Sequence, residues 1–146
     1  MELLEVKKYP NSVLRKKCEP VKEITTVEAE LFNNMLYTMR QSKGIGLACP
    51  QIGILRRIIV VDIGDGKAIK LANPAIVSSK GIDRMEEGCL SLPDVNVNVK
   101  RPFEAVVIGM NEEGRVVELN LKGLLARVVQ HEIDHLDGKL IIDYAS

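Results

Sequence analysis

The apolar residues of this chain recur with two different periods, which indicate where helices and strands lie. From Thr25 to about Ser42 they follow one another at intervals of three and four, as in an amphipathic helix with one face on a core. Thr25 and Glu28 have the spacing of a capping box, so this helix is expected to begin there. A shorter helical turn is expected at residues 13–17.

The middle of the chain has the composition and spacing of strands. The expected strands are residues 57–62, 68–72, 75–77, 95–99, 104–110 and 115–121. Asn73-Pro74 separates the second from the third, and residues 111–114 join the last two as a hairpin. Because strands fill the middle and helices lie near both ends, the sequence predicts an α+β fold with mainly antiparallel strands around a central C-terminal helix.

That last helix is expected from about Leu124 to Asp137, with Gly138 ending it in a left-handed conformation. At about 100° per residue, its polar side chains form one stripe: Arg127, Gln130, Asp134 and Asp137. Apolar residues cover most of the remaining circumference, and Glu132 falls among them. An ionised carboxylate is costly to bury, so Glu132 needs a functional explanation.

Glu132 lies inside the pattern H-E-x-x-H, which uses both histidines of the chain, His131 and His135. Side chains four residues apart share one face of a helix, so the two imidazoles can bind one metal ion. The expected chemistry is a metal-activated water whose proton is taken by Glu132. Two core histidines would be the structural alternative, but they would not explain the buried glutamate.

A catalytic metal generally has three protein ligands, and no third histidine exists. The candidates are a carboxylate or a cysteine thiolate. Cys89 lies in residues 86–93, where Gly88 and Pro93 are expected to bound an irregular segment that presents the sulfur together with a free backbone N–H. Cys49 is the competing thiolate, and either cysteine could instead be a buried core residue.

Residues 44–51 are rich in glycine and small side chains. Such a segment either lets an extended peptide approach and bind through main-chain hydrogen bonds or forms a tight turn under a helix. The spacing of a phosphate-binding or dinucleotide-binding loop is absent from it.

Composition further limits the classes of protein to which this chain could belong. The 146 residues are 46% hydrophobic and 27% charged, with 20 basic and 20 acidic side chains, so no charge excess favours nucleic acid or an anionic membrane. The start has no pattern of a secretory leader, and the three cysteines have no paired spacing. A cytoplasmic protein is expected.

Three segments together resemble the peptide deformylase family. They are Gly-x-Gly-x-Ala-x-x-Gln at residues 44–51, Glu-Gly-Cys-Leu-Ser at 87–91 and Gln-His-Glu-x-x-His at 130–135. The likeness extends from residues 13–15 to 143–144. The resemblance implies a hydrolase that removes the formyl group from the N-terminal formylmethionine of new polypeptides and releases formate.

The resemblance also implies roles for individual residues. The metal ligands would be Cys89, His131 and His135. Glu132 would serve as base and then acid, while the Gln51 side-chain amide and the Leu90 backbone N–H would hold the developing oxyanion.

For the substrate, the resemblance implies that Gly44, Ile45 and Gly46 bind the peptide main chain. Ile45, Leu124 and Val128 match positions that line an apolar pocket for the methionine side chain, although each could also be a core residue. Glu87 would lie at the site and pair with Arg101, for which a surface ion pair is the alternative.

The implied cofactor is one divalent metal ion, Fe²⁺ first, with Zn²⁺, Ni²⁺ or Co²⁺ able to occupy the same donors. The implied partners are N-formylmethionyl peptides and nascent chains, with association with the ribosome; a monomer is expected. Residues 1–146 are expected to form a single catalytic domain without a long C-terminal extension. Cys49 replaces an alanine that is usual in the family motif, which brings an extra thiol near the site.

Two other functions fit parts of the pattern. An H-E-x-x-H peptidase that cuts internal bonds is disfavoured by the cysteine ligand and the short chain. A binding module that recognises N-terminal peptides without cleaving them would have no use for Glu132, and a structural metal site would have four protein ligands.

Overall fold

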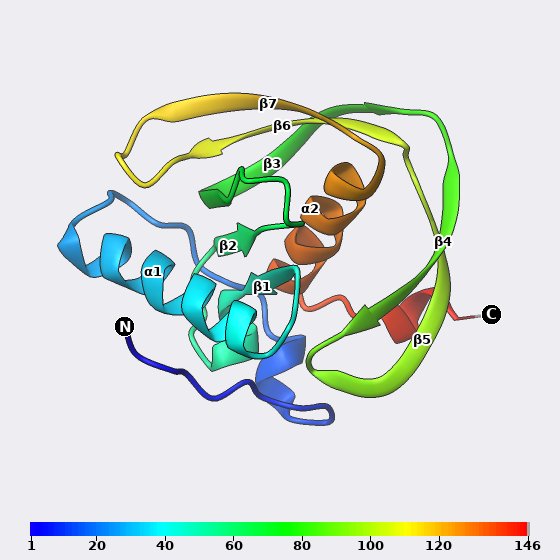
Figure 1. Cartoon of the computed structure of the whole chain (residues 1–146), viewed down its shortest axis with the longest axis horizontal. Coiled ribbons are helices and arrows are strands. Elements are labelled where there is room, and N and C mark those ends of the chain that lie inside the picture. Colours follow the sequence, from blue (N-terminus) through cyan, green and yellow to red (C-terminus); the bar gives the residue numbers. More distant parts are fainter. Residues whose placement is uncertain (146) are drawn as a thin grey trace.

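Two α-helices lie on opposite faces of an antiparallel sheet (Figure 1). The computed structural model describes residues 1–145. The helices are α1 (Thr26–Gln41) and α2 (Gly123–Leu136), with short 3-10 helices η1 (Ser12–Arg15), η2 (Cys49–Ile52) and η3 (Ile141–Tyr144). The strands are β1 (Gly46–Ala48), β2 (Ile58–Val61), β3 (Ile69–Lys80), β4 (Asp83–Cys89), β5 (Leu92–Arg101), β6 (Glu104–Met110) and β7 (Val116–Lys122).

The seven strands form two sheets. The larger has the order β1-β2-β3-β6-β7, and the smaller is the hairpin β4-β5. Every pair of named strands is antiparallel, so the predicted α+β class is confirmed. The predicted hairpin across residues 111–114 is confirmed as β6 and β7.

Strand β2 shows why its run of apolar residues is continuous. Ile59 and Val61 pack with α2, whereas Ile58 and Val60 pack with α1. Side chains alternate between the two faces of a strand, so a strand covered on both faces needs apolar residues at every position. All four side chains are fully buried.

The start of α1 confirms the predicted capping box. The Thr25 hydroxyl accepts a hydrogen bond from the Val27 backbone N–H at 3.2 Å, and the Glu28 carboxylate accepts one from the Thr25 backbone N–H at 2.7 Å. The other Glu28 oxygen pairs with Arg56 at 2.7 Å. Glu28 thus accepts a hydrogen bond from a free backbone N–H at the start of α1 and links this helix to the loop before β2.

Helix α2 lies in the middle of the molecule, with strands of the large sheet on one side and the β4-β5 hairpin curving around another (Figure 1). Its predicted end is confirmed: Gly138 follows it with a φ of +75°. A Cβ at Gly138 would collide with the Arg15 carbonyl, so this position needs glycine for space as well as for conformation. No helix within residues 1–145 is long and apolar enough to cross a membrane.

The predicted break at Asn73-Pro74 is wrong, because β3 runs through it as one strand. The break is replaced by an irregularity in the ladder with β6, where the register shifts between Ala72 and Ala75. Asn73 has a φ of +52°, and its side-chain amide exchanges two hydrogen bonds of 2.7 Å with the Val21 backbone. The Asn73–Val21 hydrogen bonds therefore support a bulge in β3, and this bulge accommodates Pro74, which a regular ladder would exclude.

The irregular segment predicted at residues 86–93 is also corrected. Glu87 to Cys89 belong to β4 and Pro93 to β5, with a tight turn at Leu90 and Ser91. Strand β4 has no apolar alternation, since most of its side chains are charged, which is why the sequence pattern did not reveal it.

We predict that Glu28→Gln destabilises the protein in a pH-dependent way. Hydrogen bonds from the Thr25 hydroxyl and backbone N–H, and then from Arg56, lower the pKa of Glu28 from 4.5 to about 2. This stabilisation is present above pH 4.5 and is lost as the pH falls toward 2. Urea unfolding should show a loss of about 1 kcal/mol at pH 7 that shrinks over this range.

The matched control is Glu30→Gln, at an exposed position of the same helix. Identical pH profiles for the two variants would contradict the role given to Glu28.

Candidate metal centre

Three metal-binding side chains converge where the end of β4 meets α2. Cys89, His131 and His135 each offer one ligand atom, and these atoms all lie within 4.8 Å of one another. The two Nε2 atoms are 3.2 Å apart, and Cys89 Sγ is 3.4 Å from His135 Nε2. Tetrahedral coordination with metal–nitrogen bonds of about 2.05 Å and metal–sulfur bonds of about 2.3 Å requires separations of about 3.3 and 3.6 Å. The donor set therefore fits one divalent ion.

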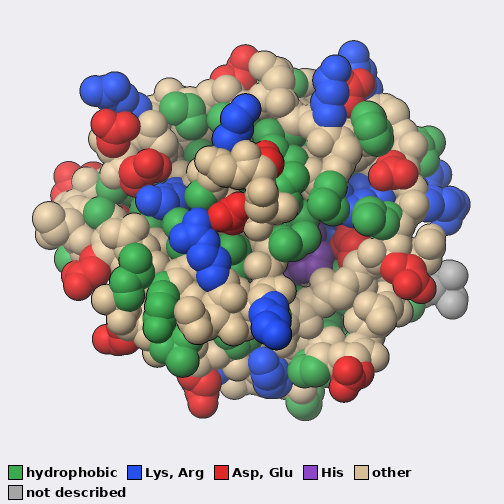
Figure 2. All heavy atoms as spheres, viewed as in Figure 1, with side chains coloured by type: hydrophobic (Ala, Val, Ile, Leu, Met, Phe, Trp, Pro, Cys, Tyr) green, Lys and Arg blue, Asp and Glu red, His purple; other side chains and the backbone are tan. Residues whose placement is uncertain are grey.

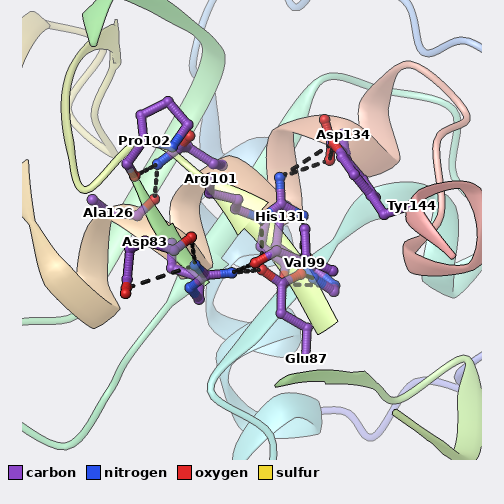
Figure 3. Close-up of polar contacts among 12 residues, drawn as sticks. Asp83, Glu87, Val99, Arg101, Pro102, Ala126, His131, Asp134 and Tyr144 are labelled. Carbon is purple, nitrogen blue, oxygen red and sulfur yellow. Dashed lines mark hydrogen bonds and ion pairs between the residues drawn. The ribbon is translucent and has the colours of Figure 1, made fainter. Parts of the chain in front are cut away.

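The tautomer of His131 suits metal binding. Its Nδ1 lies 2.9 Å from a Glu87 carboxylate oxygen, which can only accept, so Nδ1 carries a proton and Nε2 is the nitrogen left for a metal. Burial would raise the pKa of Glu87, but hydrogen bonds from His131 and Arg101 outweigh it and lower that pKa to about 2. Figure 3 shows His131 and Arg101 directed at Glu87. This carboxylate stays ionised and fixes the imidazole ring.

The anionic side chains around His131 favour a positive charge at its imidazole ring. Burial would lower the pKa of His131, but Glu132, Cys89 and Glu87 outweigh it and raise the pKa to about 10. Burial, together with the nearby His131, lowers the pKa of His135 well below its usual value, which keeps that imidazole neutral. A cation held between the two rings would replace the proton that these anionic groups attract.

Glu132 is buried, with 4% of its surface exposed, and it points toward the same place. One carboxylate oxygen lies 4.0 Å from His131 Nε2, and the other has no hydrogen-bond partner among the described residues. Burial raises the pKa of Glu132 to about 7. A Cβ at Gly46 in β1 would collide with this carboxylate, so glycine there makes room for Glu132.

Gln51 in η2 is held in one orientation beside the sulfur ligand. Its side-chain oxygen accepts from the Ala48 backbone N–H at 2.9 Å. Its Nε2 therefore faces the other way, 3.2 Å from the Ser91 hydroxyl oxygen and 3.6 Å from Cys89 Sγ. The amide N–H groups are thereby directed into the site without rotation of the side chain.

These groups open onto a cleft of about 450 Å³, within the usual range for small-ligand sites. Of the residues that the sequence assigned to the site, His135 alone does not line it. The others do: Gly44, Ile45, Gly46, Gln51, Glu87, Cys89, Leu90, Leu124, Val128, His131 and Glu132. Figure 2 shows histidine atoms at the surface of this face among hydrophobic side chains. Ile45 and Leu124 remain 43% and 41% exposed, so they border the cleft rather than the core.

Some residues of the site were not expected from the sequence. Arg127 and Gln130, from the predicted polar stripe of the last helix, are buried rather than solvated. Arg127 lines the cleft and binds Glu87, and Gln130 donates to the Pro102 carbonyl at 3.1 Å. The helix pattern gives no signal for these contacts, because their partners, Glu87 and Pro102, lie on segments distant in sequence.

Cys49 lies outside the cluster. Its sulfur is 3.7 Å from the Met35 sulfur in the core under α1, and it is fully buried. Burial raises its thiol pKa far above the usual value, and burial also raises that of Cys18 to about 11. Cys49 is thus a core residue and does not compete with Cys89 for the metal.

Comparison with known proteins agrees with this geometry. The sequence model of the family described as polypeptide deformylase matches residues 3–146. The chain belongs to the polypeptide deformylase family. A peptide deformylase of Thermodesulfovibrio yellowstonii is 48% identical, and the alignment covers 100% of this chain and 91% of that protein. A peptide deformylase of Halothermothrix orenii is 49% identical, and the alignment covers 98% of this chain and 94% of that protein. The crystal structure of the peptide deformylase from Thermotoga maritima matches with a TM-score of 0.96 at 38% identity, covering 100% of this chain and 99% of that one.

Family membership establishes the reaction. Polypeptide deformylases are metal-dependent amidohydrolases, and this chain accordingly removes the N-formyl group from nascent polypeptides. Its substrates are formylated nascent peptides. The group of Cys89, His131 and His135 is the metal site typical of this family.

We predict that only Cys89 reacts rapidly with a thiol reagent in the native, metal-stripped protein. Cys89 is partly exposed, whereas Cys18 and Cys49 are buried with raised pKa values, so few of their thiols are both ionised and accessible. Titration with a chromogenic disulfide should count one fast thiol in the native state and three in denaturant. Rapid labelling of native Cys89→Ala would contradict the burial of the other two.

Proposed function

We propose that this chain performs deformylation with Cys89, His131 and His135 as metal ligands and Glu132 as the proton-transferring residue. One observation carries the proposal: a buried carboxylate lies beside a three-donor cluster in a cleft, and one of its oxygens has no hydrogen-bond partner within residues 1–145. A bound divalent metal supplies the Lewis acidity that makes a water molecule reactive near neutral pH. The remaining chemistry belongs to side chains and backbone of the cleft.

Glu132 is suited to move protons in both directions. Its pKa of about 7 means that the carboxylate can accept the proton of the attacking water and return it to the departing amine. The carboxylate oxygen that lies 4.0 Å from His131 Nε2 is on the side of the metal donors, where this exchange would take place. Burial excludes bulk water, which would otherwise compete for the same proton.

Gln51 and Leu90 are proposed to stabilise the charge that develops on the formyl oxygen. The Gln51 amide is already oriented by Ala48, so its N–H groups need no rearrangement when that charge appears. The Leu90 backbone N–H lies in the turn directly after Cys89 and lines the same cleft. Both donors thus lie beside Cys89, Gln51 through its amide nitrogen at 3.6 Å from the sulfur and Leu90 as the next residue.

The substrate peptide is proposed to add along β1. This strand lies at one end of the large sheet, so within residues 1–145 only one of its two edges pairs with another strand, and Gly44 to Gly46 line the cleft. An extended peptide can bind such an edge through main-chain hydrogen bonds. A Cβ at Gly44 would come within 2.7 Å of Leu90, so glycine there keeps the segment close to the turn. The methionine side chain would contact Ile45, Leu124 and Val128.

Several finer features are part of the same proposal. Fe²⁺ is proposed as the metal in the cell, although a thiolate with two imidazoles also suits Zn²⁺, Ni²⁺ and Co²⁺. We propose a monomeric protein whose residues 1–146 form a single catalytic domain. It would act in the cytoplasm on formylmethionyl chains at the ribosome.

We predict that anaerobically prepared protein loaded with Fe²⁺ releases formate from formyl-Met-Ala-Ser. The acetylated peptide should give no measurable acetate or free amine, because the extra methyl group crowds the reacting carbon. Cys89→Ala should lose both stoichiometric metal and activity, since only two ligands remain. Parallel samples loaded with Zn²⁺, Ni²⁺ and Co²⁺ rank the metals under the same conditions.

Absence of formate from a folded, metal-loaded sample would overturn the proposed catalytic assignment. Tight binding of the formyl peptide in that case would instead favour a recognition module.

We predict that Glu132→Ala lowers kcat by about 10²- to 10⁴-fold, the usual contribution of a general base, while the protein still binds one metal ion. Metal content after gel filtration and formate release give the two quantities. Glu118→Ala, at an exposed position of β7, is the control and should retain both. Normal turnover in Glu132→Ala would remove this residue from the mechanism.

A further inference from the structure

The Glu87 carboxylate accepts hydrogen bonds from three buried side chains (Figure 3). One oxygen accepts from His131 Nδ1 and Arg101 Nη2, both at 2.9 Å. The other accepts from Arg101 Nε and Arg127 Nη1, both at 2.6 Å. Glu87 belongs to β4, Arg101 to β5, and the remaining two to α2. A single carboxylate therefore joins both strands of the small sheet to the metal-binding helix.

Arg127 has the widest reach of these partners. Besides Glu87, its guanidinium donates to the Val99 carbonyl at 2.9 Å and to the Asp83 carbonyl at 2.8 Å. Asp83 lies in β4 and Val99 in β5, so one side chain of α2 binds the backbone of both strands. With only 3% of its surface exposed, Arg127 is held in a single arrangement.

The position of Arg127 relates these contacts to the metal ligands. It precedes His131 by one helical turn, so the two side chains share a face of α2 and bind the two oxygens of one carboxylate. Cys89 follows Glu87 by two residues on β4. The distance from the sulfur to the imidazole nitrogens therefore depends on how closely β4 is held against α2 near Glu87.

The hairpin alone does not fix this distance. Its ladder shifts register between Glu87 and Cys89, so the strand is irregular just before the ligand. Arg101 already neutralises Glu87 through a bidentate pair. The additional contribution of Arg127 is geometric, because it attaches the strands to the helix at three acceptors.

We propose that Arg127 is a positioning residue that holds β4 against α2 and so places Cys89 Sγ beside the Nε2 atoms of His131 and His135. The inference rests on the proposed metal centre. It predicts that Arg127→Met weakens metal binding by about 10- to 100-fold, the usual effect of losing an outer-shell contact.

The test compares Arg127→Met with Arg57→Met as a matched control. Arg57 also contacts α2, donating to the Leu136 carbonyl and pairing with Asp137, both at 3.0 Å, and these partners lie at the far end of the helix from Glu87. Both variants are titrated with Co²⁺ against a competing chelator, and the visible spectrum of the Co²⁺ protein reports the sulfur and nitrogen donors. Arg127→Met should bind more weakly with an altered spectrum, and Arg57→Met should bind as the wild type does.

A double-mutant cycle tests whether Arg127 acts on the metal ligands through Glu87. If Arg127 acts through Glu87, the losses of Co²⁺ affinity in Arg127→Met and Glu87→Gln will be strongly non-additive. Arg127→Lys keeps the charge but cannot reach three acceptors, so an intermediate affinity is expected, and it replaces Arg127→Met in the cycle should that variant not fold.

The possible outcomes distinguish a failure of the positioning role of Arg127 from a failure of the proposed metal centre. Wild-type protein that binds no Co²⁺ would overturn the proposed metal centre itself. Unchanged affinity and spectrum in Arg127→Met, equal losses in Arg127→Met and Arg57→Met, or additive losses in the cycle would each overturn the positioning role alone.

Discussion

The ionised Glu87 carboxylate, buried between the small sheet and α2, is the interaction on which the site depends. Burying this charge is costly, and the structure offsets the cost with two guanidinium groups and an imidazole N–H. The same contacts select the tautomer of His131 and join three elements that are distant in sequence. Fold and chemistry thus share one set of hydrogen bonds, so a change that disturbs Glu87 affects both.

A second constraint comes from the packing of α2. The large sheet covers one side of the helix, and the described structure places Glu132 in the apolar arc that faces β1. Room for its carboxylate exists because Gly46 has no side chain. Burial raises the Glu132 pKa to about 7, which suits proton transfer. The space needed by the Glu132 carboxylate and the proposed approach of a peptide backbone therefore both depend on the small residues at 44–46.

Local sequence patterns predicted the features that depend on neighbouring residues. The capping box at Thr25, the hairpin across residues 111–114 and the end of α2 at Gly138 were all correct, because each is governed by contacts within a few residues. Strand β4 and the continuity of β3 were missed. Strand β4 pairs with the adjacent β5, but its side chains are mostly charged and show no apolar alternation. The bulge of β3 at Asn73 is held by the Val21 backbone, 52 positions away, which a local pattern does not contain.

The sequence by itself determined the chemical components of this protein. The spacing of His131 and His135 on one helix, and the presence of Glu132 among apolar residues, favoured a metal-assisted reaction over two core histidines before any tertiary contact was known. Only the tertiary structure decided between Cys89 and Cys49 and showed that Arg127 is buried against Glu87. The physical reason is that ligand distance and ion pairing depend on how β4 packs on α2, and the residues that fix this packing lie 40 positions apart in the chain.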